Sequence, residues 1–306
     1  LVNPDMKAHN LKALTKRYNI ELTQHHRAIY DTEATGELML HLLKQADAMG
    51  IKYHDEFNKH VGGAEGYKQS RPSHCTILAV DNDGLKNMFK LVSIAHTETF
   101  YRVPRIRRSD LVKYRQGLIV GSGCSNGELF ETIMNKTPEE AEKVARFYDY
   151  IEVHPKPVYS QLIDRGTIHD EWNLEDILRR LVKLGQKLDI PVCATGNVHY
   201  LHEEDAKFRE ILIGSMGGAN PLGRYPLPKV HFRTTDEMLA EFEFLGPDLA
   251  KEVVVWNTQK IADMIGEVKP IKDDLYTPKI EGSDEEVTNL TYEMAHRIYG
   301  ENLPEI

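Results

Sequence analysis

Three apolar stretches carry histidine or cysteine side chains that could ligate a transition metal. His74 opens one such stretch, Cys124 closes a second and His199 closes a third. Imidazole and thiolate are preferred ligands of zinc and related metals. If the stretches are strands, Cys124 and His199 lie at strand ends, where barrels of alternating strands and helices carry their reactive groups. One interpretation is that these side chains bind a metal. The other is that they are ordinary core residues whose polar atoms have hydrogen-bond partners.

A histidine and an aspartate near the start of the chain have the spacing of a hydrolytic pair. His26 precedes Asp31 by five positions, which can place the imidazole at a helix entrance and the carboxylate one turn inside the helix. Such a pair combines a base that activates water with an acid that holds a divalent metal. The alternative is a solvated helix start, where the helix dipole favours an aspartate.

A local basic patch contains four arginines, Arg102, Arg105, Arg107 and Arg108, followed by Lys113 and Arg115, and it is opposed only by Asp110. Such a patch can approach DNA phosphates, and a solvated region beside a helix is the alternative. The net charge of −9 argues against a protein that coats nucleic acid with its whole surface, but it leaves room for a local contact.

Composition indicates a soluble, cytoplasmic globular protein of 306 residues. No apolar run approaches the roughly 20 residues that cross a bilayer, so no membrane segment is expected. The three cysteines form no CxxC pair and cannot all be paired in disulfides, which suggests a reducing compartment. The sequence begins without methionine and shows no secretory leader, so a fragment is expected.

Strand and helix patterns alternate through the middle of the chain. Apolar and alternating runs predict strands within residues 73–80, 117–124, 150–154 and 191–200, with helices over 85–95, 137–148 and from about 173 to 188. Residues 1–50 read as two helices before this region. The alternation indicates an α/β domain with a mainly parallel sheet or barrel.

The last part of the chain is predicted to be helical. Three prolines between residues 220 and 228 indicate a linker, so we expect a domain boundary near residue 225. Capping boxes at Thr234–Glu237 and Ser283–Glu286 mark two helix starts, as another at Thr137–Glu140 does in the middle of the chain. A long helix is expected between them, from about Asp248 to Ile265, followed by an extended connector.

Four sequence blocks resemble a known family. The blocks RPSHCTILA, GSGCSNGE and ATGNVHYL, at residues 71–79, 121–128 and 194–201, resemble the second half of the PHP (polymerase and histidinol phosphatase) domain of bacterial replicative DNA polymerases. The resemblance is closest to the PolC-type DNA polymerase III alpha subunit of low-GC Gram-positive bacteria. HRAIYDTEAT at 26–35 resembles the last motif of the DEDDh-type 3′–5′ exonuclease that interrupts the PHP domain there. The resemblance covers essentially the whole chain, and the order of its motifs is specific.

The resemblance implies an internal fragment with a partial PHP-type distorted (β/α) barrel. Two helices of an exonuclease domain would precede the barrel, and a mainly helical segment would follow it. Residues 1–50 would be the C-terminal end of the 3′–5′ exonuclease, 51–225 the C-terminal part of the PHP domain, and 226–306 a linker and the start of the polymerase core.

The resemblance also assigns roles in the exonuclease. His26 would be the general base that orients the attacking water, and Asp31 the last carboxylate that binds Mg²⁺ or Mn²⁺. The other acidic residues of that site would lie upstream of Leu1, so two-metal hydrolysis is expected to be incomplete here.

Four residues match metal-ligand positions of the PHP domain, namely His74, Cys124, Asn197 and His199, and the implied metal is Zn²⁺ or Mn²⁺. The opening histidine motifs of that domain would also lie upstream. Asn197 stands where many family members have an aspartate, and its neutral amide is a weaker ligand than a carboxylate. Asn197 therefore argues against full metal occupancy and against phosphoesterase activity.

The implied function is that of a replicative DNA polymerase fragment, inactive alone. The intact protein would carry out template-directed DNA synthesis with 3′–5′ proofreading on DNA and deoxynucleoside triphosphates, with replisome subunits such as the sliding clamp as partners. Two alternatives are a metal-dependent PHP phosphoesterase and a metal-stabilised structural scaffold.

Overall fold

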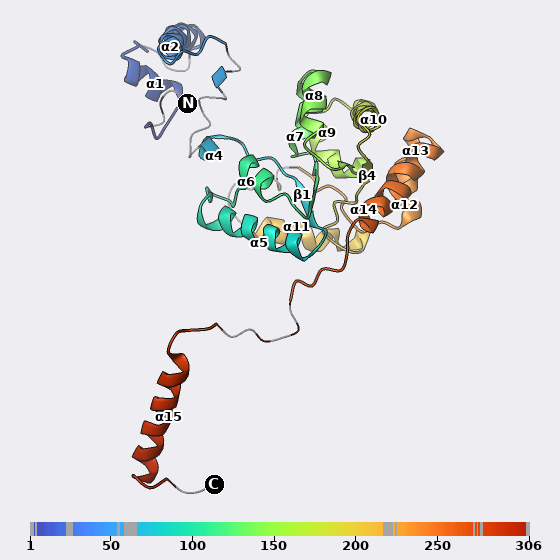
Figure 1. Ribbon diagram of the computed structural model, residues 1–306. Helices are drawn as coiled ribbons and strands as arrows, with labels where there is room; N and C mark the ends of the chain where they lie inside the picture. Colours follow the sequence, from blue (N-terminus) through green and yellow to red (C-terminus); the bar gives the residue numbers. More distant parts are fainter. Residues whose placement is uncertain are drawn as a thin grey trace. The chain divides into compact units, whose positions relative to one another are not determined.

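The computed structural model divides the chain into two compact units, Leu1–Val268 and Lys269–Ile306, whose elements are drawn in Figure 1. It describes residues 3, 5–22, 27–53, 56–57, 66–216, 223, 225–271, 273, 275 and 278–303. Neither unit has a described helix with the length and apolar character needed to span a membrane.

The first unit begins with the two helices expected from the sequence, α1 (Leu11–Tyr18) and α2 (Ala28–Ala48). The side chain of Asn10 accepts a hydrogen bond from the backbone of Ala13 and caps α1, which satisfies one of the free donors of a helix start. Buried apolar side chains then pack α1 and α2 together, among them Ile20, Ala34 and Leu38.

Four short strands form the framework of the candidate site: β1 (Thr76–Ala79), β2 (Leu118–Gly121), β3 (Ile151–Val153) and β4 (Val192–Ala194). β1 pairs with β2 and β3 with β4. An isolated bridge between Gly121 and Tyr150 joins the two pairs. The strands therefore follow one another in space in their chain order.

The prediction of a mainly parallel sheet is wrong at β1. β3 and β4 are parallel, but β1 and β2 are antiparallel, with Thr76 opposite Gly121. The connection through α5 (Asn82–Thr97) and α6 (Arg108–Lys113) returns to the end of β1, where the amide of Val80 donates to the carbonyl of Gly117 at 2.9 Å. A chain that returns to the same end of its strand must pair antiparallel. The α/β class is confirmed, and a barrel stays a proposal.

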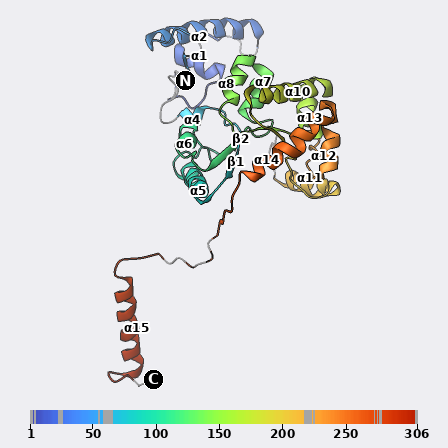
Figure 2. The ribbon, with the colours of Figure 1, turned by 45° about the vertical axis from the view of Figure 1, so that its right-hand side comes forward.

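One face of these strands packs on helices. In β3 and β4 the side chains of Ile151, Val153 and Val192 belong to a large apolar cluster, together with Leu174 and Leu178 of α10 (Glu171–Leu188). The helices α7 (Glu128–Asn135) and α8 (Pro138–Ala145) gather with α10, whereas α5 lies beside β1 and β2, as Figure 1 and Figure 2 agree. Successive side chains of a strand alternate between faces, so the residues between these point to the other side.

The remaining described residues of the first unit are helical apart from the connections. Its further elements are α4 (Gly66–Gln69), η2 (Lys156–Tyr159), α9 (Ser160–Asp164), η3 (Glu203–Asp205), α11 (Ala206–Ser215), α12 (Thr235–Glu241), η5 (Glu243–Leu245), α13 (Pro247–Lys251), the π-helical η6 (Glu252–Trp256) and α14 (Asn257–Asp263). The helix expected over residues 248–265 is thus interrupted by a π turn. Buried residues of α12, α13 and η6 share the apolar cluster of the strands, and the boundary near residue 225 stays a prediction.

Helix starts follow the predicted capping boxes in two of three cases. Thr137 caps α8 and, as predicted, Thr234 caps α12, each with a reciprocal glutamate. The prediction at Ser283 is wrong, because α15 (Ser283–Tyr299) starts at this residue and Gly282, at φ 80°, takes the cap position. The serine hydroxyl therefore lies within the first helical turn. Among its described residues, the second unit has α15 as its helix.

Candidate metal-binding cavity

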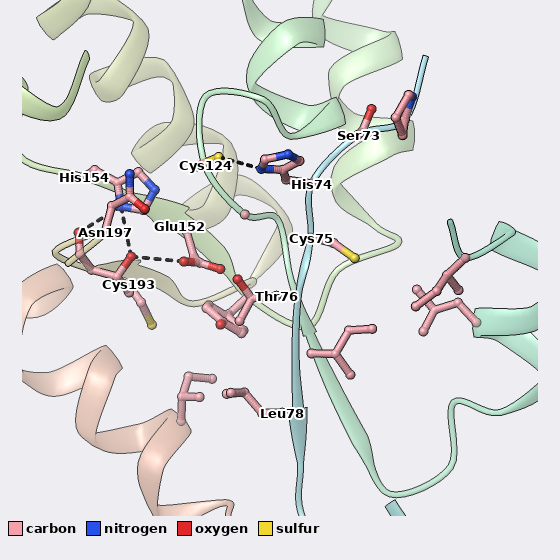
Figure 3. Close-up of a pocket in the computed structure, with 18 of the residues that line it drawn as sticks. Ser73, His74, Cys75, Thr76, Leu78, Cys124, Glu152, His154, Cys193 and Asn197 are labelled. Carbon is pink, nitrogen blue, oxygen red and sulfur yellow. Dashed lines mark hydrogen bonds between the residues drawn. The ribbon is translucent and has the colours of Figure 1, made fainter. Parts of the chain in front are cut away.

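A cavity of about 1030 Å³ lies against the strand face that is turned away from α10. Its polar lining includes His74, Cys75, Thr76, Cys124, Tyr150, Glu152, His154, Cys193, Thr195 and Asn197, and its apolar lining includes Leu78, Ile106, Leu111, Ile261 and Ile265. Figure 3 shows the labelled members around this space. The cavity is large enough for a small ligand.

Two of the predicted metal ligands meet at this cavity. The Sγ atom of Cys124 lies 3.3 Å from Nδ1 of His74, although the two residues are 50 positions apart. The amide of His74 donates to the carbonyl of Asn126 at 3.0 Å, which ties the segment before β1 to the loop after β2. The pair therefore results from the β1–β2 pairing. His74 is exposed and Cys124 is half-buried.

The other two predicted ligands follow β4 and are placed differently. Asn197 lines the cavity and has a left-handed backbone, with φ 46°. His199 is exposed and is not among the lining residues. Its Nδ1 lies 2.8 Å from the carbonyl oxygen of Asn197, and its amide donates to Val230. The structure thus brings His74, Cys124 and Asn197 to one cavity and leaves His199 outside its lining.

Three further polar residues on the floor of the cavity were missed by the sequence reasoning. Glu152 and His154 alternate with Ile151 and Val153 along β3, and Thr195 follows β4. The hydroxyl of Thr195 donates to Oε2 of Glu152 at 3.0 Å and lies 3.0 Å from Nδ1 of His154. The signal was present in the sequence, because polar residues alternate with fully apolar ones in a short strand.

Burial shifts the pKa values of several side chains that line the cavity. Desolvation raises the pKa of Cys193 to about 12, with a further contribution from Glu152, so this thiol stays protonated near neutral pH. Desolvation and the same carboxylate raise the pKa of the Tyr150 phenol. Desolvation lowers the pKa of His154. Cys193 is therefore a poor thiolate ligand, whereas neutral His154 keeps a lone pair.

The donor chemistry of the cavity fits a divalent transition metal, but the number of converging donors is small. In the described part of the chain, no three histidine, cysteine or acidic side chains converge on a point that could hold an ion. Nε2 of His154 and Oε1 of Glu152 are buried and lack hydrogen-bond partners of good geometry, although a hydrogen bond between the Tyr150 phenol and the Glu152 carboxylate contributes to the raised pKa of Tyr150. Such atoms usually have a partner, and both can donate an electron pair to a metal.

The structure describes one of the two predicted exonuclease residues. His26 is outside the described residues. Asp31 is half-buried in the first turn of α2, a position that the helix dipole favours for an acid in any case. The geometry of the pair therefore remains a prediction.

Three of the four arginines of the predicted DNA-binding patch contact other protein groups. Arg105 donates to the carbonyl of Ser70 at 2.8 Å, Arg107 binds Asp110 at 2.7 Å, and Arg108 pairs with Glu128. Arg102 is exposed, and its guanidinium lies 5.5 Å from the ring centre of Tyr101. Of these four arginines, Arg102 therefore has the guanidinium that is most accessible to a DNA phosphate.

Comparison with known proteins confirms the resemblance that the sequence blocks indicated. A model of the PHP domain matches residues 9–153. DNA polymerase III PolC-type of Bacillus subtilis is 59% identical over 303 residues, which is 99% of this chain and 21% of the relative. This chain is a homologue of part of PolC-type DNA polymerase III. The corresponding proteins of Listeria welshimeri and Pediococcus pentosaceus are 56% and 52% identical, again over 99% of this chain and 21% of their own length.

The chain thus spans about a fifth of the length of these relatives. The PHP match begins before α1 and ends with β3. It therefore includes residues that we predicted to belong to an exonuclease, and the three predicted domain ranges stay proposals.

Proposed function

We propose that this chain is a segment of a PolC-type replicative DNA polymerase whose intact form copies a DNA template and removes mismatched 3′ ends. The observation that carries the proposal is the 59% identity over 303 residues to the Bacillus subtilis relative. Because identity extends over 99% of the chain, it includes the surface as well as the core. The substrates would be DNA and deoxynucleoside triphosphates, with Mg²⁺ or Mn²⁺ at the polymerase and exonuclease sites.

An exchange of segments tests this proposal. The matching segment of the Bacillus subtilis polymerase is replaced by this chain, and primer extension and removal of a mismatched 3′ nucleotide are measured. We expect both activities to be retained. A matched chimaera that carries Asp31→Asn should extend primers normally but lose mismatch removal, since Asp31 is proposed to bind a catalytic metal. A soluble exchange protein that extends no primer would contradict the proposal.

For the cavity we propose a bound Zn²⁺ or Mn²⁺ ion with His74 and Cys124 as protein ligands and Asn197 at the same cavity. The proposal is supported by the 3.3 Å approach of imidazole and thiol and by the preference of such metals for these donors. A bound ion would supply a cross-link between the segment before β1 and the loop after β2. His199 stays a proposed ligand, and its ring would have to turn from the carbonyl of Asn197 into the cavity to reach the ion.

We favour a structural role for this ion over phosphoester hydrolysis. The specific observation is the neutral amide of Asn197 at the cavity, together with the few converging donors among the described residues. A chelator should lower the melting temperature of the chain, and His74→Ala should lower it equally without chelator. Metal-dependent hydrolysis of a generic phosphodiester by the purified chain would instead favour the phosphoesterase. A melting temperature that responds to neither change would contradict the metal site.

A further inference from the structure

Positive charge is concentrated on α5, α6 and the segment that joins them. Residues 82–116 contain eight lysine and arginine residues and three acidic residues, which gives this segment a net charge of +5 in a chain whose total is −9. Figure 1 and Figure 2 both show α6 beside α5. The segment is therefore a local basic surface on an otherwise acidic chain.

Three exposed lysines form a row on this surface, Lys86 and Lys90 of α5 and Lys113 of α6. Because Lys86 and Lys90 are four positions apart, they lie on one side of the helix, about 6 Å apart along its axis. The Nζ atoms of Lys90 and Lys113 lie 5.3 Å and 5.0 Å from the ring centre of Tyr114. One aromatic ring thus brings the lysines of the two helices together into a lysine row.

The protein itself does not neutralise the lysine row. Among the described residues, no carboxylate forms an ion pair with any of its three members. By contrast, the nearby Arg107 and Arg108 are paired with Asp110 and Glu128. Like charges four positions apart destabilise a helix, so Lys86 and Lys90 repel each other. A ligand with a row of negative charges would offset this repulsion.

An exposed aromatic side chain lies beside the lysine row. Phe89 is 53% exposed and follows Lys86 by three positions, which makes the two side chains neighbours on the helix surface. The packed side of α5 carries Leu91 and Ala95 instead, and both are buried. Surfaces that bind single-stranded nucleic acid combine cations along the backbone with aromatic rings on which bases stack. An acidic peptide would need the cations alone.

We propose that the lysine row and Phe89 bind single-stranded DNA, with the lysines on phosphates and a base stacked on the phenylalanine ring. The inference rests on the proposed polymerase function, because copying a template requires an unpaired strand. The charges extend in a row over two helices rather than converging on one point, which suits a polyanion better than a small anion. The lysines are additional to the four arginines of the predicted DNA-binding patch.

Binding of a fluorescent oligothymidylate to the full chain tests the proposal. The affinity is measured by anisotropy at several salt concentrations, because each phosphate contact of a single strand contributes about 0.7 to the slope of log affinity against log salt. Lys86→Gln with Lys90→Gln should lower this slope by about 1.4, and Lys113→Gln should lower it by about 0.7 more. An unchanged slope in these variants, once they are shown to be folded, would overturn the inference.

A matched control is available on α10. Lys183 and Lys187 are exposed and have the same four-residue spacing, but Lys187 is paired with Glu142. Lys183→Gln with Lys187→Gln removes the same charge and should leave the slope unchanged. An equal fall of the slope in both double variants would overturn the inference, since it would indicate attraction by the overall charge.

The aromatic part of the proposal has its own variant. Phe89→Ala should weaken binding at least about fivefold without changing the salt slope, because it removes a stacked base and no charge. Phe208→Ala, at a 55% exposed phenylalanine of α11, is the control and should change nothing. If Phe89→Ala has no effect and an oligoglutamate peptide binds as tightly as the oligonucleotide, the inference is overturned in favour of an acidic protein partner.

A measurement on the unmodified chain covers the case in which the variants do not fold. An oligonucleotide that contains 5-bromodeoxyuridine is bound and irradiated, and the cross-linked peptides are identified by mass spectrometry. Cross-links are expected in α5, and cross-links confined to residues outside 82–116 would overturn the inference. An exchange protein that extends primers would then leave the proposed polymerase function intact, so the two proposals fail independently.

Discussion

At Gly121 the absence of a side chain makes room for two groups of the neighbouring strand. A Cβ atom built at this position would lie 2.4 Å from Cζ of Tyr150 and 2.7 Å from Oε1 of Glu152. Real atoms do not approach so closely, and Tyr150 is only 4% exposed, so the tyrosine has little space in which to move. The glycine therefore allows the floor of the cavity to be polar and tightly packed.

We expect Gly121→Ala to destabilise the chain by about 1–3 kcal/mol, the usual cost of overpacking a core. The measurement is urea unfolding in the presence of a chelator, so that metal binding makes no contribution. Gly214→Ala is the control, because a Cβ there meets no described atom within 4 Å, and in α11 alanine is favoured over glycine. An equal effect of both changes would contradict the packing argument.

A capping box and a proline fix the start of α8. The hydroxyl of Thr137 accepts from the amide of Glu140, and the Glu140 carboxylate accepts from the amide of Thr137. Pro138 occupies the first helical position, where its missing N–H costs nothing. Buried Ala141 and Ala145 then face the apolar cluster. The cap therefore fixes where the helix enters the core.

Thr137→Ala should lower the free energy of unfolding by about 1 kcal/mol, because the backbone amide of Glu140 loses the hydroxyl that accepts its hydrogen bond. Ser283→Ala is the informative control, since the same sequence pattern occurs there but Gly282 takes the cap position. Denaturant unfolding should be unchanged in this second variant. A comparable loss at both positions would show that α15 is capped by its serine after all.

The Glu175 carboxylate of α10 makes two ion contacts, one with Lys156 of η2 and one within the helix. Glu175 lies 2.9 Å from Nζ of Lys156 and 2.9 Å from Nη2 of Arg179, and its side chain is 18% exposed. Burial alone would raise the pKa of Glu175, but the two cations lower it below its ordinary value. The unfolded chain therefore takes up this proton at a higher pH than the folded chain does.

The ion contacts of Glu175 therefore stabilise the folded chain at pH values above the ordinary glutamate pKa of about 4.3. This stabilisation is lost as the pH falls through the lowered pKa of Glu175 in the folded chain. Glu175→Gln should cost about 0.5–1 kcal/mol at neutral pH and less at low pH. Urea unfolding between neutral and acidic pH measures both. Glu210→Gln, at an exposed residue of α11, is the control. A loss at Glu175→Gln that did not depend on pH would indicate packing rather than charge.

For the molecule as a whole, the net charge of −9 opposes general attraction to DNA, so any contact must come from local cations. Arg102 is exposed, whereas Arg107 is held by Asp110. In the intact polymerase, we expect Arg102→Gln to reduce the salt dependence of DNA affinity by about one phosphate contact. Arg107→Gln should leave that slope unchanged. An unchanged slope in Arg102→Gln would remove this arginine from the DNA-binding surface.

Local sequence patterns were sufficient for the element order, the α/β class and two capping boxes. Helical periodicity, strand alternation and cap chemistry act over a few neighbouring residues, and the sequence contains all of that information. The motif order likewise identified the polymerase family from short blocks. His74 and Cys124 lie 3.3 Å apart, and their role as metal ligands stays a proposal.

Only the tertiary structure decided which residues face one another across the cavity. The antiparallel direction of β1 depends on where the connection from Val80 to Gly117 returns, and no local pattern specifies that. The group of Glu152, His154 and Thr195 depends on the pairing of β3 with β4, which brings residues about 40 positions apart into hydrogen-bond contact. Such contacts are set by the packing of whole strands. For this reason the sequence reasoning named His74 and Cys124 but missed Glu152, His154 and Thr195.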